Sequence, residues 1–394
     1  MGATGLSVVI IGGGIGGLAA ARALLRRGVD VGVYEQAAQI TEVGAGVSIS
    51  PNGVELLQRY GMGPAIEQVG ARWMDAQFCR SDGTPLGSML PPPPLRSSFH
   101  QFGIHRSDLI DLLAAALPPD VVRTGYRCTG VDQNAECATV SFSNGETVTA
   151  DVVVAADGIH SVLREHGGES PAAVPSGSVG YRGLIPAASV SWPAGTVRVW
   201  VGPDRHFVTY PVRSGSLLTF LATVPTDAEM GESWSAPGEP AMLAQEFAGW
   251  DPLVESIIGQ VDTTFRWRLH DREPLSKWTN GRLTLLGDAA HAMLPHVGQG
   301  ANQAIEDGAA LAAVLGAADR TTAAQALLTY ESVRRDRTTR VQQISRSSLV
   351  RMRAASGSAG ERREPPRAEE MSWLFGYDAE AEVYAAMGTH DALA

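Results

Sequence analysis

The sequence has 394 residues, of which 44% are hydrophobic and 19% are charged, and its formal net charge is -11. This length exceeds one ordinary hydrophobic core, so we expect two domains in a soluble globular protein. The negative charge argues against a nucleic acid or an anionic membrane surface as the partner. Cys79, Cys128 and Cys137 show no metal-ligand spacing, so we expect no metal site and a reducing, cytoplasmic location.

The chain opens with the pattern of a parallel βαβ unit. A strand is predicted over residues 6–11, a helix over 14–27 and a second strand over 31–35. The apolar start has no basic residues before it and ends in glycines after one strand length. It therefore predicts neither a signal peptide nor a membrane span.

The turn of this unit, GGGIGG, contains the G-x-G-x-x-G pattern at Gly12, Gly14 and Gly17. These glycines suit a tight turn, the close approach of a pyrophosphate to the backbone, and close packing of the helix on the strand. Glu35 ends the second strand, where a carboxylate can accept hydrogen bonds from ribose hydroxyls. The unit predicts dinucleotide binding and does not separate NAD from FAD.

The middle of the chain changes from helical to strand-like patterns. Short alternating runs occupy residues 71–104, and a helix is predicted over 105–117. Further strands are predicted over 121–126, 139–142 and 148–154. From 176 to 264, β-branched and aromatic residues punctuated by Gly and Pro predict an antiparallel sheet in a second domain.

Residues 281–315, GRLTLLGDAAHAMLPHVGQGANQAIEDGAALAAVL, run from an apolar strand through a loop with two histidines into a helix of small residues. Asp288 and Gly300 stand on either side of this loop. A helix that begins at Gly300 would offer free N–H groups and the positive end of its dipole to a developing negative charge.

These elements predict an α/β protein in which a Rossmann-type nucleotide-binding domain is interleaved with a smaller α+β domain that contains an antiparallel sheet. The nucleotide-binding domain is expected to comprise residues 1–70, 105–175 and 276–345. The substrate domain is expected to comprise 71–104 and 176–275, and a C-terminal helical segment 346–394.

Two later motifs resemble fingerprints of flavoprotein aromatic hydroxylases. DVVVAADGIHSVLRE, residues 151–165, is similar to their D-G fingerprint, and LLGDAAHAMLP, residues 285–295, to their G-D-A-A-H-x-x-x-P fingerprint. The residues that match the first are Asp157, Gly158, Ser161 and Arg164. With HRSDL and GAGVSISPN, the similarity spans roughly residues 6 to 345. The chain thus resembles single-component FAD-dependent monooxygenases (class A) of the salicylate hydroxylase and 6-hydroxynicotinate 3-monooxygenase type.

The resemblance implies an FAD domain of the p-hydroxybenzoate hydroxylase (GR2) type, noncovalently bound FAD, and NADH or NADPH as the co-substrate. It also implies that Asp288 holds the ribityl chain of the flavin and that the helix from Gly300 points its amides at the pyrimidine edge of the ring. The cofactor-binding residues that it implies are Gly12, Gly14, Gly17, Glu35, Arg106, Asp157, Asp288, Pro295, Gly298, Gly300, Ala301 and Asn302.

Three side chains are candidates for catalysis. His206 and Tyr210 are four residues apart on a predicted strand and so point to one face, while His296 lies in the loop beside the expected flavin. The resemblance implies that all three line the substrate pocket, and histidine has an ordinary pKa that suits a base near neutral pH. The alternative is that His206 and Tyr210 are ordinary sheet residues. For His291 we expect a structural role.

The resemblance implies hydroxylation, with O₂ and through a flavin C4a-hydroperoxide, of a small phenolic or aminobenzoic acid or a related secondary metabolite. Ser48 stands where hydroxynicotinate hydroxylases carry a substrate-contacting histidine, which argues against hydroxynicotinate as the substrate. Two alternatives stay open, an FAD-dependent reductase or oxidase of secondary metabolism and a non-catalytic FAD-fold escort. The sequence decides neither between NADH and NADPH nor between a monomer and a homodimer.

Overall fold

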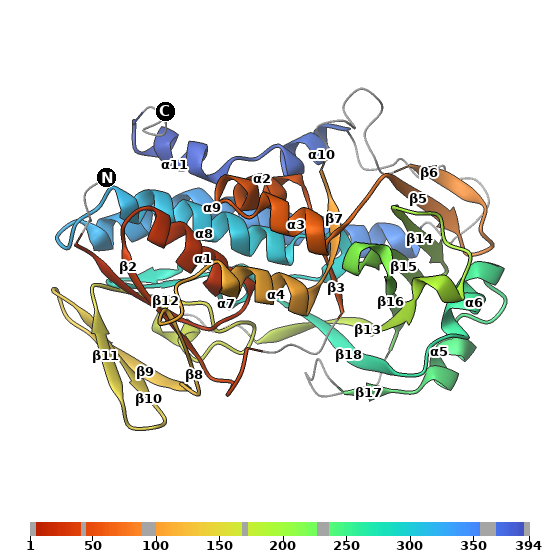
Figure 1. Cartoon of the computed structure of the whole chain (residues 1–394), viewed down its shortest axis with the longest axis horizontal. Coiled ribbons are helices and arrows are strands. Elements are labelled where there is room, and N and C mark those ends of the chain that lie inside the picture. The colour runs from red at the N-terminus through yellow and green to blue at the C-terminus, as the bar shows by residue number, and fades with distance from the viewer. Residues whose placement is uncertain are drawn as a thin grey trace.

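The computed structural model describes residues 5–40, 45–88, 100–167, 172–226, 236–354 and 368–389. Two large sheets lie toward opposite ends of the molecule, and long helices connect them (Figure 1). One of these helices, α9 (Ala323–Ala354), contacts strands of both sheets. The fold is therefore an α/β arrangement in which one helix spans two sheets.

The first sheet has the strand order β19-β20-β12-β1-β2-β8. Its strands are β1 (Ser7–Ile11), β2 (Asp30–Glu35), β8 (Val122–Thr124), β12 (Val152–Ala155), β19 (Thr279–Asn280) and β20 (Leu283–Leu285). Helix α1 (Ile15–Arg26) joins β1 to the parallel β2, so the predicted βαβ unit is confirmed. Strands β1, β12 and β20 are parallel neighbours, so their carboxyl ends meet at one edge of the sheet.

The strand predicted over 148–154 is in fact two strands, because the chain bends at Asp151. Strand β11 (Thr147–Ala150) pairs with β10 (Ala138–Phe142) in a small antiparallel sheet, and β12 enters the six-stranded sheet. The Asp151 carboxylate accepts hydrogen bonds of 2.8 and 2.9 Å from the Ser7 N–H and hydroxyl, which fixes the bend. The third strand of the small sheet, β9 (Cys128–Gln133), was not predicted.

The second large sheet has the order β17-β18-β13-β16-β15-β14-β5-β6. Its strands are β5 (Asp75–Arg80), β6 (Pro85–Ser88), β13 (Ala173–Pro186), β14 (Thr196–Gly202), β15 (Arg205–Val212), β16 (Leu217–Pro225), β17 (Pro237–Gly238) and β18 (Thr264–Arg272). All of its neighbouring pairs are antiparallel except β14 with β5, so the antiparallel sheet predicted from 176 to 264 is confirmed.

Two short helices interrupt that predicted run of strands. Helices α5 (Pro240–Glu246) and α6 (Pro252–Ile258) each begin with proline at the first helical turn, and Asp251 caps α6. Their apolar side chains pack in one core with Trp200, Phe207 and Phe220 of the sheet. The helices therefore cover one face of the second sheet and leave its other face to the interior of the molecule.

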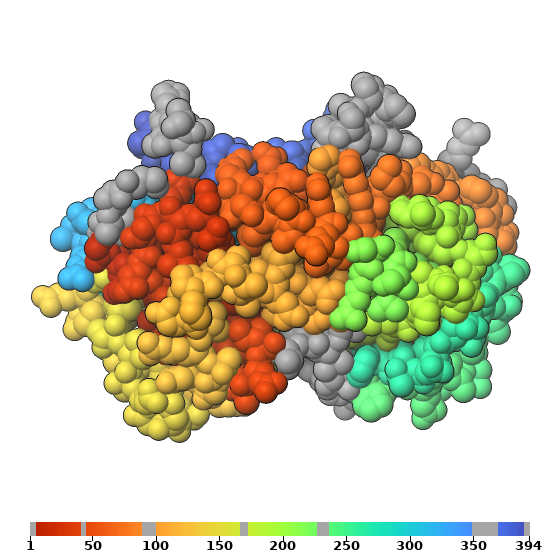
Figure 2. Space-filling model, in the orientation of Figure 1, coloured from red at the N-terminus to blue at the C-terminus, as the bar shows by residue number. Residues whose placement is uncertain are grey.

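Helix α8 (Gly300–Gly316) runs through the centre of the molecule, and its residues from Asn302 to Leu315 are all buried. A Cβ at Gly308 would lie 2.9 Å from the Ala20 backbone, so this glycine lets α8 approach α1 closely. The C-terminal helices α10 (Ala368–Phe375) and α11 (Ala379–Ala386) lie across α2, α8 and α9 and form one margin of the molecule (Figures 1 and 2).

A third, three-stranded sheet joins the two halves. Its strands are β3 (Gly46–Ile49), β7 (Phe102–His105) and β4 (Ala71–Arg72). The remaining helices are α2 (Pro51–Arg59), α3 (Gly63–Val69), α4 (Arg106–Ala115) and α7 (Asp288–His291). None of the described helices combines the length and the apolar character that crossing a membrane requires.

Candidate active site

A cavity of about 410 Å³ lies between the carboxyl edge of the six-stranded sheet and the free face of the eight-stranded sheet. This volume is in the range that suits a small ligand or the reactive part of a cofactor. Residues from both sheets line it, among them Gly14, His206, Tyr210, Asp288 and His296. The structure thus brings the separated sequence motifs to one place.

The glycine turn after β1 leaves one helix start open. A Cβ at Gly17 would lie 2.0 Å from the Gly12 carbonyl oxygen, so Gly17 serves the close packing of α1 on the turn. Gly14 precedes the first residue of α1, and a Cβ there would meet none of the described atoms within 4 Å. Gly14 also lines both cavities, so the N-terminus of α1 borders open space, as the binding of a pyrophosphate requires.

Glu35 closes the turn from the other side. Its Oε2 accepts a 2.7 Å hydrogen bond from the Gly13 N–H, and its Oε1 accepts one of 2.8 Å from the Ala37 N–H. Each oxygen keeps a second acceptor position for a hydroxyl group. Glu35 lines a second cavity beside the first, together with Gly12, Arg106 and Asp157. The two adjoining cavities match the elongated form of a dinucleotide.

The loop after β20 lines the first cavity and leads to the N-terminus of α8, which also borders this cavity. Gly298, with a φ of +63°, turns the chain into α8, and a Cβ at Gly300 would meet none of the described atoms within 4 Å. The Asn302 side chain donates to the Ser48 and Gly298 carbonyls at 3.1 and 2.9 Å and accepts from the Ser50 N–H at 2.9 Å. This side chain is occupied in holding the loop, so a ligand would meet other groups of the loop.

Arg164, from the D-G motif, fastens this motif to the loop after β20. The guanidinium is almost fully buried and donates to the Ala289 carbonyl at 2.8 Å, the Asp288 carbonyl at 3.1 Å and the Gly158 carbonyl at 3.2 Å. Burial is the largest influence on its pKa and lowers it to about 10, so Arg164 remains charged near neutral pH. One side chain thereby sets the distance between two motifs that are over a hundred residues apart.

The free face of the eight-stranded sheet supplies the other wall of the cavity. His206, Val208 and Tyr210 alternate along β15 and all line it. The ring centroids of His206 and His296 are 5.2 Å apart, so one histidine from the sheet and one from the loop meet across the cavity. The sequence-based prediction that these two histidines share a site agrees with this geometry.

Tyr210 is held by close contacts with glycines. Cβ atoms at Gly46 and Gly103 would lie 2.9 and 2.7 Å from its ring, and the Trp73 ring centroid is 5.3 Å away. Burial raises the pKa of the Tyr210 phenol above its ordinary value. The hydroxyl therefore stays protonated and can donate a hydrogen bond, but it does not act as a base at neutral pH.

The charged side chains around the cavity are mostly basic. Arg106, Arg182 and Arg268 line it, and Asp288 is the one acidic residue among the lining residues that the structure describes. Strand pairing places Arg182 in one row with Leu221 and Val208 on the free sheet face. Its guanidinium lies 5.1 Å from the Trp267 ring centroid, which orients it. The side chains that line the cavity are thus mostly positive, although the net charge of the whole molecule is -11.

Most of the predicted site residues line one of the two cavities. The first is lined by Gly14, Arg106, His206, Tyr210, Asp288, Pro295, His296, Gly298, Gly300 and Ala301. The second is lined by Gly12, Gly14, Glu35, Arg106 and Asp157. Gly17 and Asn302 are buried in packing and line neither. His291 lies behind the site, 2.6 Å from the Asp307 carboxylate, which fits the expected structural role.

Several residues that line the first cavity were not predicted from the sequence. These are Trp73, Arg182, Trp267, Met371 and Phe375. Strand alternation would have placed Arg182 and Trp267 on a sheet face, but which face is interior depends on α5 and α6, which were not predicted. Met371 and Phe375 belong to the C-terminal helix α10, and no local pattern indicates that this helix returns to the site.

A family model described as FAD binding domain matches residues 5–345 of the chain. The chain belongs to this FAD-binding family. The open helix starts at Gly14 and Gly300 and the adjoining cavities fit such a cofactor, and the predicted resemblance is confirmed. Among the described residues, no group of three or more His, Cys, Asp or Glu side chains could hold a metal ion.

Relatives of this FAD-binding protein are monooxygenases. A 3-amino-4-hydroxybenzoate 2-monooxygenase of Streptomyces platensis is 38% identical over 383 residues, which cover 94% of this chain and 96% of the relative. The salicylate hydroxylase of Pseudomonas putida is 34% identical over 413 residues, covering 96% of this chain and 94% of that protein. The prediction of an FAD-dependent monooxygenase is thereby confirmed over the reductase and escort alternatives.

Solved structures show the same fold over the whole chain. A salicylate hydroxylase substrate complex has a TM-score of 0.82 at 30% identity and covers 99% of both chains. Klebsiella pneumoniae HpxO complexed with FAD and uric acid has a TM-score of 0.80 at 31% identity, over 98% of this chain and 96% of that one. The α/β architecture of this FAD-binding protein is thus that of flavin-dependent hydroxylases.

Proposed function

We propose that this protein hydroxylates a small aromatic acid that carries a phenol or amino group, using bound FAD, O₂ and NADH or NADPH. The proposal is supported chiefly by the first cavity. In it, the glycine turn after β1 and the loop after β20 lie opposite His206, Tyr210 and Arg182 of the eight-stranded sheet. The named relatives, which act on aminohydroxybenzoate and salicylate, support this substrate class. Ser48 in the cavity wall, in place of histidine, argues against hydroxynicotinate.

The reaction consumes substrate, O₂, NAD(P)H and one proton, and it yields the hydroxylated substrate, water and NAD(P)⁺. When bound, FAD accepts hydride from NAD(P)H and activates O₂ for transfer of one oxygen atom to an electron-rich ring. Every other task falls to the protein. It must hold the ring, take the proton from its hydroxyl group, and exclude water from the cavity.

Several backbone and side-chain groups are proposed to hold FAD. The pyrophosphate would meet the N–H groups at Gly14, and the adenosine ribose would meet Glu35, in the second cavity with Gly12 and Asp157. The ribityl chain would meet Asp288, and the flavin ring would meet the N–H groups from Gly300 onward. The remaining groups proposed near FAD are Arg106, Pro295, Gly298 and Ala301; Gly17 supports the turn, and Asn302 supports the loop.

We propose that His206 or His296 accepts the proton of the substrate hydroxyl at a ring nitrogen. Deprotonation makes the ring a stronger nucleophile, and a positioned base contributes about 10² to 10⁴-fold to the rate. The protonated Tyr210 phenol would donate a hydrogen bond to the substrate. Arg182 would pair with the substrate carboxylate, because it is the basic residue on the same sheet face as His206 and Tyr210.

We propose the same division into domains that the sequence predicts, because the strands of each large sheet come almost entirely from the residue ranges expected for one domain. All strands of the six-stranded sheet fall within 1–70, 105–175 and 276–345. Strand β5 pairs with β14 from the 176–275 region and β6 pairs with β5, which supports the inclusion of 71–104 in the substrate domain. We also propose a cytoplasmic location, since the three cysteines are free thiols, and a monomer or homodimer as the assembly.

The test is a screen of NADH and NADPH oxidation by the FAD-loaded protein with phenolic and aminobenzoic acids, with product masses measured. We expect at least one acid both to accelerate NAD(P)H oxidation and to gain the mass of one oxygen atom. Amides of the same acids serve as matched neutral controls and should be poorer substrates. Oxidation of NAD(P)H without a heavier product for any acid would contradict the proposal.

A further inference from the structure

The C-terminal helix α10 contributes to the wall of the active-site cavity. Met371 and Phe375, four residues apart and so on one face of α10, line the same cavity as His206, Tyr210 and His296. Both side chains are partly buried. The family model ends at residue 345, so this apolar part of the wall lies outside the region that defines FAD binding.

Arginines of α9 hold α10 in place. The Arg337 and Arg340 guanidinium groups lie 4.7 and 3.9 Å from the Trp373 ring centroid. Arg337 also donates hydrogen bonds to the Trp373 and Leu374 carbonyls, at 3.3 and 2.9 Å. These carbonyls belong to the last turn of α10, where a cation is also favoured by the helix dipole.

The residues that follow α10 are also held in place by contacts with arginines. The Tyr377 ring centroid lies 3.6 Å from the Arg337 guanidinium carbon. Arg59 of α2 pairs with Asp378 at 2.6 Å and with Glu380 at 2.6 Å, and Arg27, which directly follows α1, pairs with Glu380 at 2.7 Å. The C-terminal segment is thus anchored on both sides of Phe375, to α9 and to the FAD-binding half of the molecule.

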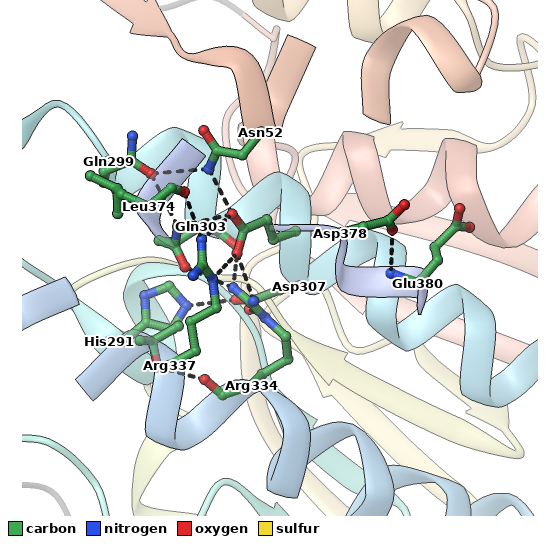
Figure 3. A network of polar contacts seen from close by, with 12 residues as sticks. Asn52, His291, Gln299, Gln303, Asp307, Arg334, Arg337, Leu374, Asp378 and Glu380 are labelled. Atoms are coloured by element: carbon green, nitrogen blue, oxygen red, sulfur yellow. Dashed lines mark hydrogen bonds and ion pairs between the residues drawn. The ribbon is translucent and has the colours of Figure 1, made fainter. Parts of the chain in front are cut away.

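A buried polar network connects this anchor to the loop that faces the flavin position (Figure 3). Arg337 donates to both oxygens of Glu306, at 2.7 and 2.9 Å. Glu306 accepts a 2.6 Å hydrogen bond from the Asn52 amide, which also donates to Gln299 at 3.1 Å. Gln299 immediately precedes α8 and lines the cavity. One continuous set of contacts therefore fixes α10 relative to the loop.

We propose that α10 is a specificity-determining wall of the active site. Phe375 and Met371 set the size and shape of the aromatic ring that the cavity accepts, since an aromatic and a flexible thioether side chain both pack well against a ring. Arg337 is a positioning residue that keeps this wall in register with the loop at Gln299. This inference rests on the proposed function, in that the occupant of the cavity is an aromatic acid.

The test measures binding of two acids to the FAD-loaded protein by titration of the flavin absorption spectrum, without NAD(P)H. The probes are salicylate, with one ring, and 3-hydroxy-2-naphthoate, with two. In Phe375→Ala and Met371→Ala we expect the dissociation constant of salicylate to rise, and the preference for the two-ring acid over salicylate to increase about tenfold, as hydrophobic pockets discriminate by such factors. Glu369→Ala, an exposed position on the same helix, is the matched control and should keep the wild-type preference.

Because Arg337 is buried and its replacement endangers folding, Arg340→Met serves as a second probe of the anchor. Arg340 is exposed and contacts Trp373 without bonding to Glu306 in the described chain. We expect a shift of the ring preference in the same direction as for Phe375→Ala, but smaller, with FAD retention and the melting temperature close to those of the wild type. A merely structural contact would leave the ring preference unchanged.

The proposal is overturned if Phe375→Ala and Met371→Ala retain FAD and keep the ring preference within twofold of the wild type. The titration needs no turnover, so it separates the two proposals. A shifted preference in a protein that hydroxylates none of the acids would contradict the proposed function alone. Hydroxylation with an unchanged preference would contradict the role of α10 alone.

Discussion

His206 and His296 illustrate what single residues allow to be predicted. Their residue type and the spacing from Tyr210 indicated a shared face, and the two rings indeed lie 5.2 Å apart. Arg182 was missed, because an arginine in an alternating strand is equally compatible with solvent and with a cavity. What places it inside is the pairing of β13 with β16 and the covering of the opposite sheet face by α5 and α6.

The histidines lead to the first prediction. Replacing the residue that acts as the base, by His206→Ala or His296→Ala, should lower the rate of hydroxylation by about 10² to 10⁴-fold, the usual contribution of a positioned base. The dissociation constant of FAD should change little, because the other elements of the cofactor site remain. Rapid-mixing kinetics and flavin titration measure the two effects. Wild-type turnover in both variants would show that the base lies elsewhere.

The second prediction concerns the charge of Arg182. Arg182→Gln should raise the KM for an aromatic acid by about tenfold or more, since a charge-assisted hydrogen bond contributes about 1.5 to 3 kcal/mol. It should affect the corresponding amide far less. The matched control is Arg266→Gln on the neighbouring strand, whose guanidinium lies 5.5 Å from the Tyr181 ring centroid and does not line the cavity. Equal effects of Arg182→Gln on acid and amide would contradict a carboxylate role.

At the scale of elements, the parallel strands of the nucleotide-binding half were predictable, because their continuous apolar runs and glycine turns are strong local signals. The predicted strand over 148–154 failed for the same reason. Residues with a preference for strands stand on both sides of Asp151, although the two halves belong to different sheets. Helices α5 and α6 were missed, since each is only seven residues long and carries too little periodicity to detect.

The two glycines of the first turn yield the third prediction. Gly17→Ala should destabilise the fold, because its Cβ would lie 2.0 Å from the Gly12 carbonyl oxygen. Gly14→Ala should leave the melting temperature nearly unchanged but weaken FAD binding, since the added methyl group projects into the space in front of α1. Thermal unfolding with and without FAD separates the two cases. If Gly14→Ala binds FAD as tightly as the wild type, the pyrophosphate does not bind at the N-terminus of α1.

At the scale of the whole molecule, the sequence predicted two interleaved domains but not the buried polar network that joins α8, α9 and the C-terminal segment. Glu306, Asp307 and Arg334 have fully buried side chains, although charged residues in a helix usually indicate a solvent-exposed face. Only the complete set of partners makes their burial favourable. Such partners come from distant parts of the chain, so no local pattern reveals them.

The fourth prediction tests this network through pH. Burial alone would raise the pKa of Asp307, but the charges of His291 and Arg334 outweigh it and lower the pKa from 3.8 to about 2. The ionised carboxylate therefore stabilises the fold above about pH 4, and this contribution is lost as the pH falls from about 4 to about 2. Asp307→Asn should lower the free energy of unfolding at pH 7 by about 3 kcal/mol.

The same variant should also lose stability less steeply than the wild type between about pH 4 and about pH 2. Urea unfolding over a pH series measures both quantities. Asp336→Asn is the matched control, because this carboxylate on α9 is 84% exposed and should have little effect. An unchanged unfolding free energy in Asp307→Asn would show that the buried network contributes no stability.

Hydroxylation of an aromatic acid by the FAD-loaded protein is tested most directly by the source of the oxygen atom in the product. The FAD-loaded protein is supplied with NAD(P)H, an accepted phenolic or aminobenzoic acid and ¹⁸O₂. The product is analysed by mass spectrometry, and the amount of hydrogen peroxide formed is measured separately. We expect one ¹⁸O atom per product molecule and consumption of about one NAD(P)H per hydroxylation. Label from water, or stoichiometric hydrogen peroxide with an unoxygenated product, would contradict it.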